Sequence, residues 1–309
     1  MIHERFERRF VCHHFNKILF IISTKFLTSS KMRYISTRGE KSTTYSFETA
    51  ITSGYAPDAG LFVPIELPTI SSDKLQSWAK LGYPALAAEC LRLFISEEEI
   101  PFPDLKRLCE ASFQKEEEGG FDDPENAVVV KPLGEPNGDN SYSNFISELF
   151  HGPTFCFKDL GMKFVVNVLS YFCSMRKQKM TLLVSTTGDT GPAAVQSVSD
   201  IHDNEYLSIL VHYPRGQISS LQRKQLTTIK SKNVKVVAFE GGGDDMDSPI
   251  KNILTGKSEY KKESISARKL CGVNSYNIGR PLMQMVHYVS FTPAEIEKNT
   301  FNNFFCIHA

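Results

Sequence analysis

HGPTFCFKDLGMKF, residues 151–164, follows the strand-like run NFISELF at 144–150, and its Gly-Pro pair signals a turn after that run. Lys158 then stands at the start of an amphipathic segment, with Phe155 and Phe157 close to it in sequence. Aromatic walls disfavour the charged form of an amine, so we expect the pKa of Lys158 to fall towards the range in which it acts as nucleophile, base or Schiff-base former. The alternative is a solvated lysine at a helix start, because ammonium groups are seldom fully buried without a partner.

Beyond Asn126 the sequence changes to a pattern of alternating strands and helices. The expected strands are AVVVKPL (127–133), NFISELF (144–150), TLLVSTT (181–187), YLSILVHYP (206–214) and NVKVVAFEG (233–241). The expected helices cover about 157–176, 188–200, 219–230 and 247–262. This alternation predicts an α/β fold with a mostly parallel sheet flanked by helices on both faces. Ligands bind at the carboxyl ends of strands in such sheets, and the Lys158 turn lies at one such end.

A second glycine-rich turn, STTGDTGPAA at 185–194, follows the next predicted strand. Its glycines let the backbone approach a ligand, its hydroxyls can donate, and the following helix presents unpaired N–H groups and the positive end of its dipole. These features predict a site for a carboxylate or phosphate, formed by Thr186, Thr187, Gly188 and Thr190. The alternative is an ordinary strand-to-helix turn capped by Asp189.

The chain is expected to have about two domains, because 309 residues exceed the size at which a single core keeps growing. Helical periodicity over 72–116 and the loop GYAPDAGLFVP (54–64) predict a small, mainly helical domain at 32–118. A charged, glycine-containing segment then marks the boundary to a second domain at 119–289, and 290–309 is interpreted as an unrelated tail. The sole tryptophan, Trp78, is expected in the core.

Composition limits the classes of partner. The chain is 41% hydrophobic, 23% charged and formally neutral, and it has no basic stripe, so no nucleic-acid partner is expected. Its seven cysteines are scattered, without a CxxC pair or a ligand-spaced Cys/His cluster, which predicts reduced thiols, no metal site and a cytoplasmic protein. The apolar run at 18–22 is far shorter than the ~20 residues of a membrane span. Residues 1–31 are interpreted as a disordered or non-native leader, with a mitochondrial targeting peptide as the alternative.

Four motifs in order resemble the threonine synthase family, a branch of the fold type II pyridoxal-phosphate enzymes. They are Met32–Glu40 with GYAPDAGLFVP, then HGPTFCFKD, then STTGDTGPAA, and finally NSYNIGRPLMQMVHY at 274–288. Within this family the motifs resemble the animal threonine synthase-like 2 group more than the microbial enzymes. The resemblance implies an incomplete fold type II domain in which Lys158 holds pyridoxal 5'-phosphate and removes the substrate α-proton, while the cofactor acts as electron sink.

The resemblance also implies roles for the other motif residues. Thr186, Thr187, Gly188 and Thr190 would bind the substrate carboxylate, and Asp189 would lie near the ring hydroxyl of the cofactor. The substrate phosphate would be bound by Asn274, Ser275, Asn277 and Arg280, because a guanidinium fork suits a phosphate. The alternative for this last motif is a capped helix start with one surface arginine.

Two departures from the family pattern bear on function. NSYNIGR stands where NSINWxR is usual, so Tyr276 and Ile278 change the wall beside the expected phosphate site. The chain also shows no counterpart of the family's late loop for the cofactor phosphate, so it resembles a truncated enzyme. Two functions stay open: a phospho-lyase that acts on a small O-phosphorylated amino acid (O-phosphothreonine to 2-oxobutyrate, or O-phosphohomoserine to threonine), or an inactive fragment that at most binds a partner. The sequence gives no oligomeric state.

Overall fold

A computed structural model describes residues 32–115, 120–134, 144–201, 205–257, 268–296 and 303–307. The predicted leader at 1–31 and the predicted end of the 247–262 helix lie outside these residues. None of the helices in the described part of the chain combines the length and apolar content needed to cross a membrane.

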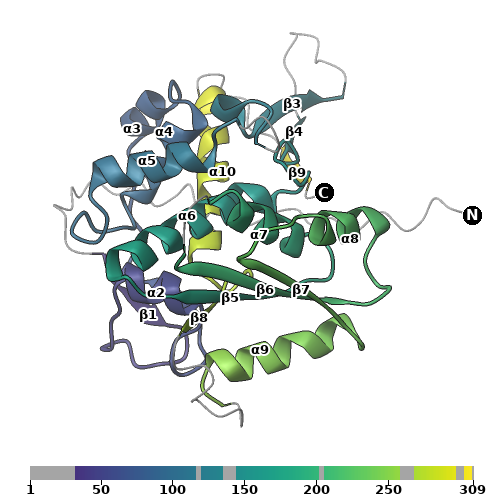
Figure 1. Cartoon of the computed structure of the whole chain (residues 1–309). Coiled ribbons are helices and arrows are strands. Elements are labelled where there is room, and N and C mark those ends of the chain that lie inside the picture. The colour runs from purple at the N-terminus through teal and green to yellow at the C-terminus, as the bar shows by residue number, and fades with distance from the viewer. Residues whose placement is uncertain are drawn as a thin grey trace, which may run out of the picture.

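Four parallel strands form the central sheet in the order β7-β6-β5-β8. They are β5 (Met180–Ser185), β6 (Leu207–Pro214), β7 (Val234–Phe239) and β8 (Lys269–Gly272). Strand β5 is buried along nearly its whole length, as an inner strand covered on both faces must be. The helices α6 (Lys158–Arg176), α7 (Thr190–Ser199) and α8 (Ser220–Thr227) cover one face, and α9 (Asp247–Leu254) covers the other (Figure 1). The predicted parallel sheet flanked by helices is confirmed.

A second, smaller sheet has the order β3-β4-β9. Its strands are β3 (Val129–Leu133), β4 (Asn144–Glu148) and β9 (Asn303–Ile307). Strand β4 pairs antiparallel with β3 and parallel with β9, and it does not join the central sheet. The expectation of one sheet for all the strands is therefore corrected: only residues 134–143 lie between β3 and β4, fewer than the dozen or more that a crossover between parallel strands needs, and the two neighbours pair directly.

The boundary predicted at residue 289 does not separate structural units. Helix α10 (Gly279–Ile296) runs across it, and β9 adds to β4. The 290–309 segment, interpreted as an unrelated tail, thus contributes described backbone to both a helix and a sheet.

The N-terminal part contains a short β-ribbon and four helices. Its elements are β1 (Tyr34–Ser36), α2 (Phe47–Ser53), β2 (Phe62–Pro64), α3 (Ser72–Trp78), α4 (Tyr83–Leu91) and α5 (Phe102–Ser112). Short 3-10 turns follow at Pro124–Asn126 and, after β7, at Gly243–Met246. Trp78 is 4% exposed, which confirms its place in the core.

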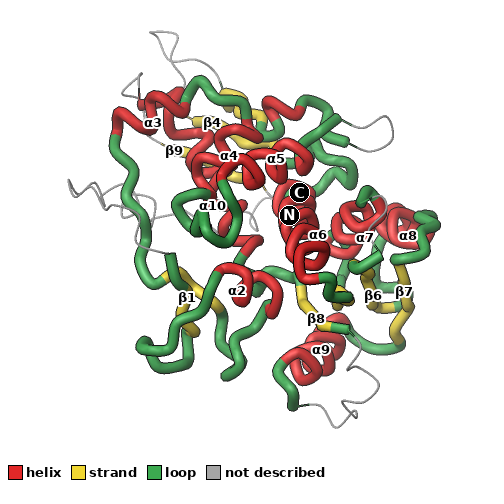
Figure 2. The backbone as a smooth tube through the Cα atoms, turned by 60° about the vertical axis from the view of Figure 1, so that its left-hand side comes forward, coloured by secondary structure: helices red, strands yellow, loops and turns green. Residues whose placement is uncertain are grey.

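One apolar core runs through both parts of the chain. Phe47 of the N-terminal part and Phe172 of α6 belong to the same cluster of buried side chains as Leu182 of β5. Helix α10 packs against α4 and α6, and Figure 2 shows it beside α4 from a second side. A buried contact of 2.5 Å between the Tyr83 hydroxyl and His287 Nδ1 joins α4 to α10. The two predicted domains, 32–118 and 119–289, therefore share one apolar core, and α6 packs in it.

Candidate active site

Lys158 is the first residue of α6, and the turn before it is held by a buried carboxylate. Asp159 is 1% exposed and accepts hydrogen bonds from the Thr154 backbone N–H at 2.8 Å and from its hydroxyl at 2.6 Å. Burial raises the pKa of Asp159, although both Thr154 hydrogen bonds act to lower it. Gly152 is required here, because a Cβ would lie 2.6 Å from the Asp159 Cβ. Asp159 thus fixes the turn that presents Lys158.

The Lys158 ammonium contacts Asp189, which lies between β5 and α7. Lys158 Nζ donates to Asp189 Oδ2 at 2.5 Å, and the two side chains keep exposed fractions of 17% and 36%. The Phe157 ring centroid lies 4.0 Å from Nζ, whereas Phe155 points to solvent and is 63% exposed. Only one of the two expected aromatic walls is therefore present, and a carboxylate supplies the other contact.

The glycine-rich turn is organised from within by Thr186. This buried residue accepts hydrogen bonds through Oγ1 from the backbone N–H of Gly188 at 3.1 Å and of Gly191 at 2.9 Å. Thr187 is exposed and Thr190 is half-buried, so these two hydroxyls are the ones that a ligand can reach. The Asp189 side chain makes no capping hydrogen bond to α7, so the alternative of an ordinary capped turn is wrong for this residue.

The 274–280 motif divides into structural and accessible residues. Asn277 is fully buried: its amide donates to the carbonyls of Ile51 at 2.8 Å and Gly272 at 2.9 Å, and its oxygen accepts from Gly279 N at 3.0 Å. Its hydrogen-bonding groups are thus used within the chain, and contact between Asn277 and a substrate stays a prediction. Ser275 is exposed.

Asn274 and Arg280 carry unused polar groups. Asn274 donates to the Ser185 carbonyl at 2.8 Å, while its buried Oδ1 has no hydrogen-bond partner among the described residues. Arg280 Nη1 donates to the Val273 carbonyl at 3.3 Å, and no carboxylate in the described ranges forms an ion pair with it. Burial lowers the pKa of Arg280 to about 10, and the nearby carboxylates of Asp189 and Asp159 act in the opposite direction.

Arg280 lies against the same helix that starts at Lys158. A Cβ placed on Gly161, in the first turn of α6, would lie 3.1 Å from Arg280 Nε. The glycine therefore lets the guanidinium lie close to the helix. Together with the Lys158–Asp189 contact, this brings the three separate motifs of the sequence to one place.

Sequence reasoning missed the residues behind the glycine-rich turn. The Ser185 hydroxyl donates to Asp247 at the start of α9, and Tyr55 stacks on Tyr276 with ring centroids 4.1 Å apart. Burial raises the pKa of Tyr276, whose hydroxyl has no hydrogen-bond partner among the described residues. The loop at 54–64 contacts the last motif through Tyr55. The aromatic side chains at 55 and 276 were the available signal.

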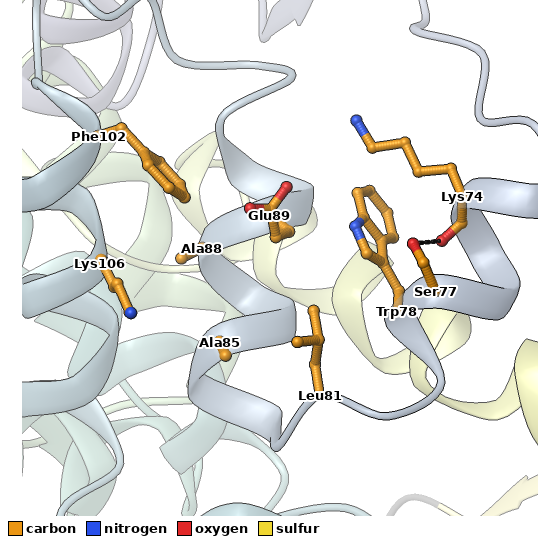
Figure 3. A pocket seen from close by; sticks show the side chains of 9 residues that line it. All are labelled: Lys74, Ser77, Trp78, Leu81, Ala85, Ala88, Glu89, Phe102 and Lys106. Atoms are coloured by element: carbon orange, nitrogen blue, oxygen red, sulfur yellow. Dashed lines mark hydrogen bonds between the residues drawn. The ribbon is translucent and has the colours of Figure 1, made fainter.

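A hollow of about 420 Å³ lies elsewhere, among α3, α4 and α5 (Figure 3). Trp78 and Phe102 lie on its opposite sides, with Lys74 and Lys106 near its mouth. None of the motif residues lines it. Among the described residues, no group of three or more His, Cys, Asp or Glu side chains could hold a metal ion.

The sequence of this chain is similar to those of known proteins. Residues 33–113 match the family model described as "Threonine synthase N terminus". Threonine synthase-like 2 of Homo sapiens is 38% identical over 257 residues, which cover 83% of this chain and 49% of that protein. Threonine synthase of Saccharomyces cerevisiae is 36% identical over 264 residues, covering 82% of this chain and 48% of that protein. The chain thus spans about half the length of the curated relatives it matches.

Solved structures agree with the sequence matches. Threonine synthase from yeast superposes with a TM-score of 0.70 at 32% identity, covering 87% of this chain and 51% of that one. PLP-bound threonine synthase from Brucella melitensis gives a TM-score of 0.69 at 29% identity, covering 85% and 52%. The fold is that of the fold type II enzymes, over about half of their length. Sequence and structure together show that the matched part of this chain belongs to the threonine synthase family.

Proposed function

We propose that this chain carries the part of a pyridoxal-phosphate-dependent lyase that contains the cofactor-binding lysine, Lys158. The lyase eliminates phosphate from a small O-phosphorylated amino acid. The observation that carries the proposal is the contact of 2.5 Å between Lys158 Nζ and Asp189 Oδ2 at the start of α6. The similarity to threonine synthases, among them the PLP-bound enzyme from Brucella melitensis, supports the same assignment.

The residues present fit an aldehyde cofactor at this place. The Lys158 amine is reachable from solvent, with an exposed fraction of 17%, so its Nζ can form a covalent bond to the aldehyde carbon. The Asp189 carboxylate, released from that amine, can accept a hydrogen bond from a ring hydroxyl. When bound, the cofactor supplies an electron sink for the electrons left after loss of the α-proton.

Different residues of the chain would then accept the α-proton and bind the substrate carboxylate. Lys158 accepts the α-proton at Nζ, because the amine is free once the substrate has taken its place. The exposed hydroxyl of Thr187, the backbone of Gly188 and the half-buried Thr190 are placed to orient a carboxylate at the start of α7. Thr186 shapes this turn through the two backbone hydrogen bonds that its Oγ1 accepts, and its O–H can still donate to the carboxylate.

Arg280 is the receptor we assign to the substrate phosphate. Its guanidinium is part-buried and has no carboxylate partner among the described residues, so an incoming dianion would satisfy it by charge-assisted hydrogen bonds. The unpartnered Oδ1 of Asn274 can accept a hydrogen bond from the substrate ammonium or from a protonated phosphate oxygen. Ser275, which is exposed beside it, can donate to the same phosphate.

Cofactor binding is tested on the purified chain. Incubation with pyridoxal phosphate should produce a visible absorption band, and borohydride should then fix the cofactor to Lys158, as located by peptide mass spectrometry. Lys158→Ala should abolish the band. Lys179→Ala is the matched control, because Lys179 is an exposed lysine just beyond the other end of α6. A band of equal strength in both variants would show that the cofactor does not use Lys158.

Turnover is tested separately with two substrates. Release of inorganic phosphate from O-phosphothreonine, with 2-oxobutyrate as product, would identify a phospho-lyase, and threonine formed from O-phosphohomoserine would identify a synthase. Cofactor binding without turnover of either would support the alternative of a fragment that binds but does not catalyse.

A further inference from the structure

A second hollow lies at the amino ends of the strands of the central sheet, at the opposite end from Lys158. It has a volume of about 730 Å³ and is lined by residues before β6, β7 and β8, among them Glu205, Lys230, Lys232 and Arg268. Arg268 contacts Met180, the first residue of β5, whereas Asp189 follows the last residue of that strand. A strand of this length spans roughly 17–20 Å, so the hollow is separate from the site proposed for catalysis.

Arg268 is held in place by neutral acceptors alone. Its Nε donates to Thr181 Oγ1 at 2.9 Å, and its Nη2 donates to Ser208 Oγ at 3.0 Å and to the Met180 carbonyl at 3.3 Å. Two neighbouring strands therefore orient the guanidinium without neutralising its charge. No described residue accepts a hydrogen bond from Nη1, which leaves the two N–H groups of this nitrogen for a ligand.

Two further cations stand at the same hollow. Lys230 and Lys232 are exposed on the loop between α8 and β7. That loop is tied down at Asn233, whose amide oxygen lies 2.5 Å from Ser231 Oγ and whose nitrogen donates to the Val198 carbonyl at 3.4 Å. Glu205 is the one carboxylate among the described lining residues, so among these residues three positive charges face one negative charge.

We propose that this hollow is a second anion site that binds a small phosphate-bearing molecule. A volume of about 730 Å³ falls in the range of roughly 300–1,000 Å³ that is typical of small-molecule sites. The polar lining and the excess of positive charge favour a polyanion over an apolar ligand. Nη1 of the fixed guanidinium keeps two N–H donors without an acceptor among the described residues, and phosphate oxygens can accept from them.

Inorganic pyrophosphate is the probe, titrated into the chain at low ionic strength and followed by calorimetry. The measurements use chains that carry Arg280→Met, so that the phosphate receptor proposed for catalysis does not contribute. In this background Lys230→Met with Lys232→Met should weaken binding several-fold, and Arg268→Met should weaken it by at least about tenfold. Glu205→Gln should tighten binding, because it removes the opposing charge.

Lys235→Met is the matched control, because it removes one exposed lysine of β7 that does not line the hollow. Arg268→Met removes three hydrogen bonds from the sheet, so circular dichroism must show that it folds. If it does not, the double lysine variant, which changes exposed side chains only, decides the matter. The proposal is overturned if pyrophosphate produces no binding heat, or if the double lysine variant binds as tightly as the Lys235→Met control. Cofactor binding by Lys158 plays no part in this measurement, so failure of one proposal leaves the other testable.

Discussion

Two lysines of α6 pair with aspartates at opposite ends of α7, and the pairs differ in their access to solvent. Lys158 contacts Asp189 before α7, with exposed fractions of 17% and 36%. Lys163 contacts Asp200 after α7 at 2.9 Å, with exposed fractions of 5% and 15%. Asp200 is also held by a hydrogen bond of 2.7 Å from the Gln196 amide, whereas no further hydrogen bond to the Asp189 side chain is found among the described residues.

This difference separates a structural pair from a chemical one. A buried ion pair that loses one partner leaves an uncompensated charge in a medium that solvates it poorly. An accessible pair can open, because water and ligands can replace either partner. The Lys163–Asp200 pair therefore stabilises the packing of α6 against α7, whereas the Lys158–Asp189 pair leaves an amine that can change its partner.

The largest expected effect comes from breaking the buried pair. Lys163→Met should lower the free energy of unfolding by roughly 3–5 kcal/mol, because Asp200 is left buried without its cation. Lys158→Met should change it far less, because both partners of that pair reach solvent. Urea denaturation of the two variants side by side measures the contrast. Equal losses of stability would show that the two pairs are not distinguished by burial.

Asp159, which follows Lys158 in the sequence, should make the stability difference between the wild type and Asp159→Asn depend on pH. Burial raises the pKa of Asp159 in the folded state above its ordinary value near 3.9. Its contribution to stability is therefore complete below that ordinary value and is lost as the pH rises through the raised one. The stability difference between the wild type and Asp159→Asn should shift in favour of the wild type as the pH falls from 7 to about 4, by about 1.4 kcal/mol for each unit of the pKa difference.

Urea denaturation of both chains at several pH values measures this difference. Because Asn does not titrate, the variant removes only this proton and leaves the other carboxylates as a common background. A difference that moves in favour of Asp159→Asn on acidification would contradict the raised pKa.

The sequence predicted individual helices and turns of the site better than it predicted the contacts between them. The helix that starts at Lys158 and the turn before α7 follow from turn residues and apolar spacing, and both are present. The partner of Lys158 could not be found in this way, because Asp189 lies on a different strand-to-helix turn and meets the lysine only when α6 packs beside α7. Asn277 shows the same limit, because one of its three backbone partners, Ile51, is 226 residues away in the sequence.

Sheet membership was the other part that local pattern left open. The amino-acid sequence of β4 resembles those of the strands in the central sheet, but β4 pairs with its neighbour β3 and with β9. Strand β8 was missed because its four residues form no periodic pattern. The place of the Lys158 turn beside the central sheet is thus set by the packing of α6 and not by β4.

The glycine-rich turn allows a smaller test of how Asp189 is presented. Gly188 has a φ of +155°, and a Cβ there would lie 2.6 Å from Gln222 Nε2. Gly188→Ala should therefore destabilise the fold by about 1–3 kcal/mol and shift Asp189 away from Lys158. Gly216→Ala is the matched control, because Gly216 also has a positive φ, of +74°, but has no atoms within 4 Å of the added Cβ. Thermal unfolding of both variants separates crowding from backbone strain, and equal losses would exclude a role for Gln222.

The smallest effect is expected at Phe155, the exposed residue of the Lys158 turn. Its φ is +60°, a left-handed conformation that costs a residue with a Cβ roughly 1–2 kcal/mol relative to glycine. Because the side chain is 63% exposed, Phe155→Ala removes little burial and keeps the strain, whereas Phe155→Gly relieves it. The glycine variant should therefore be the more stable of the two by about 1 kcal/mol, after the loss of chain entropy on folding is counted. Urea denaturation measures the order, and an alanine variant at least as stable as the glycine variant would show that the turn is not strained at this residue.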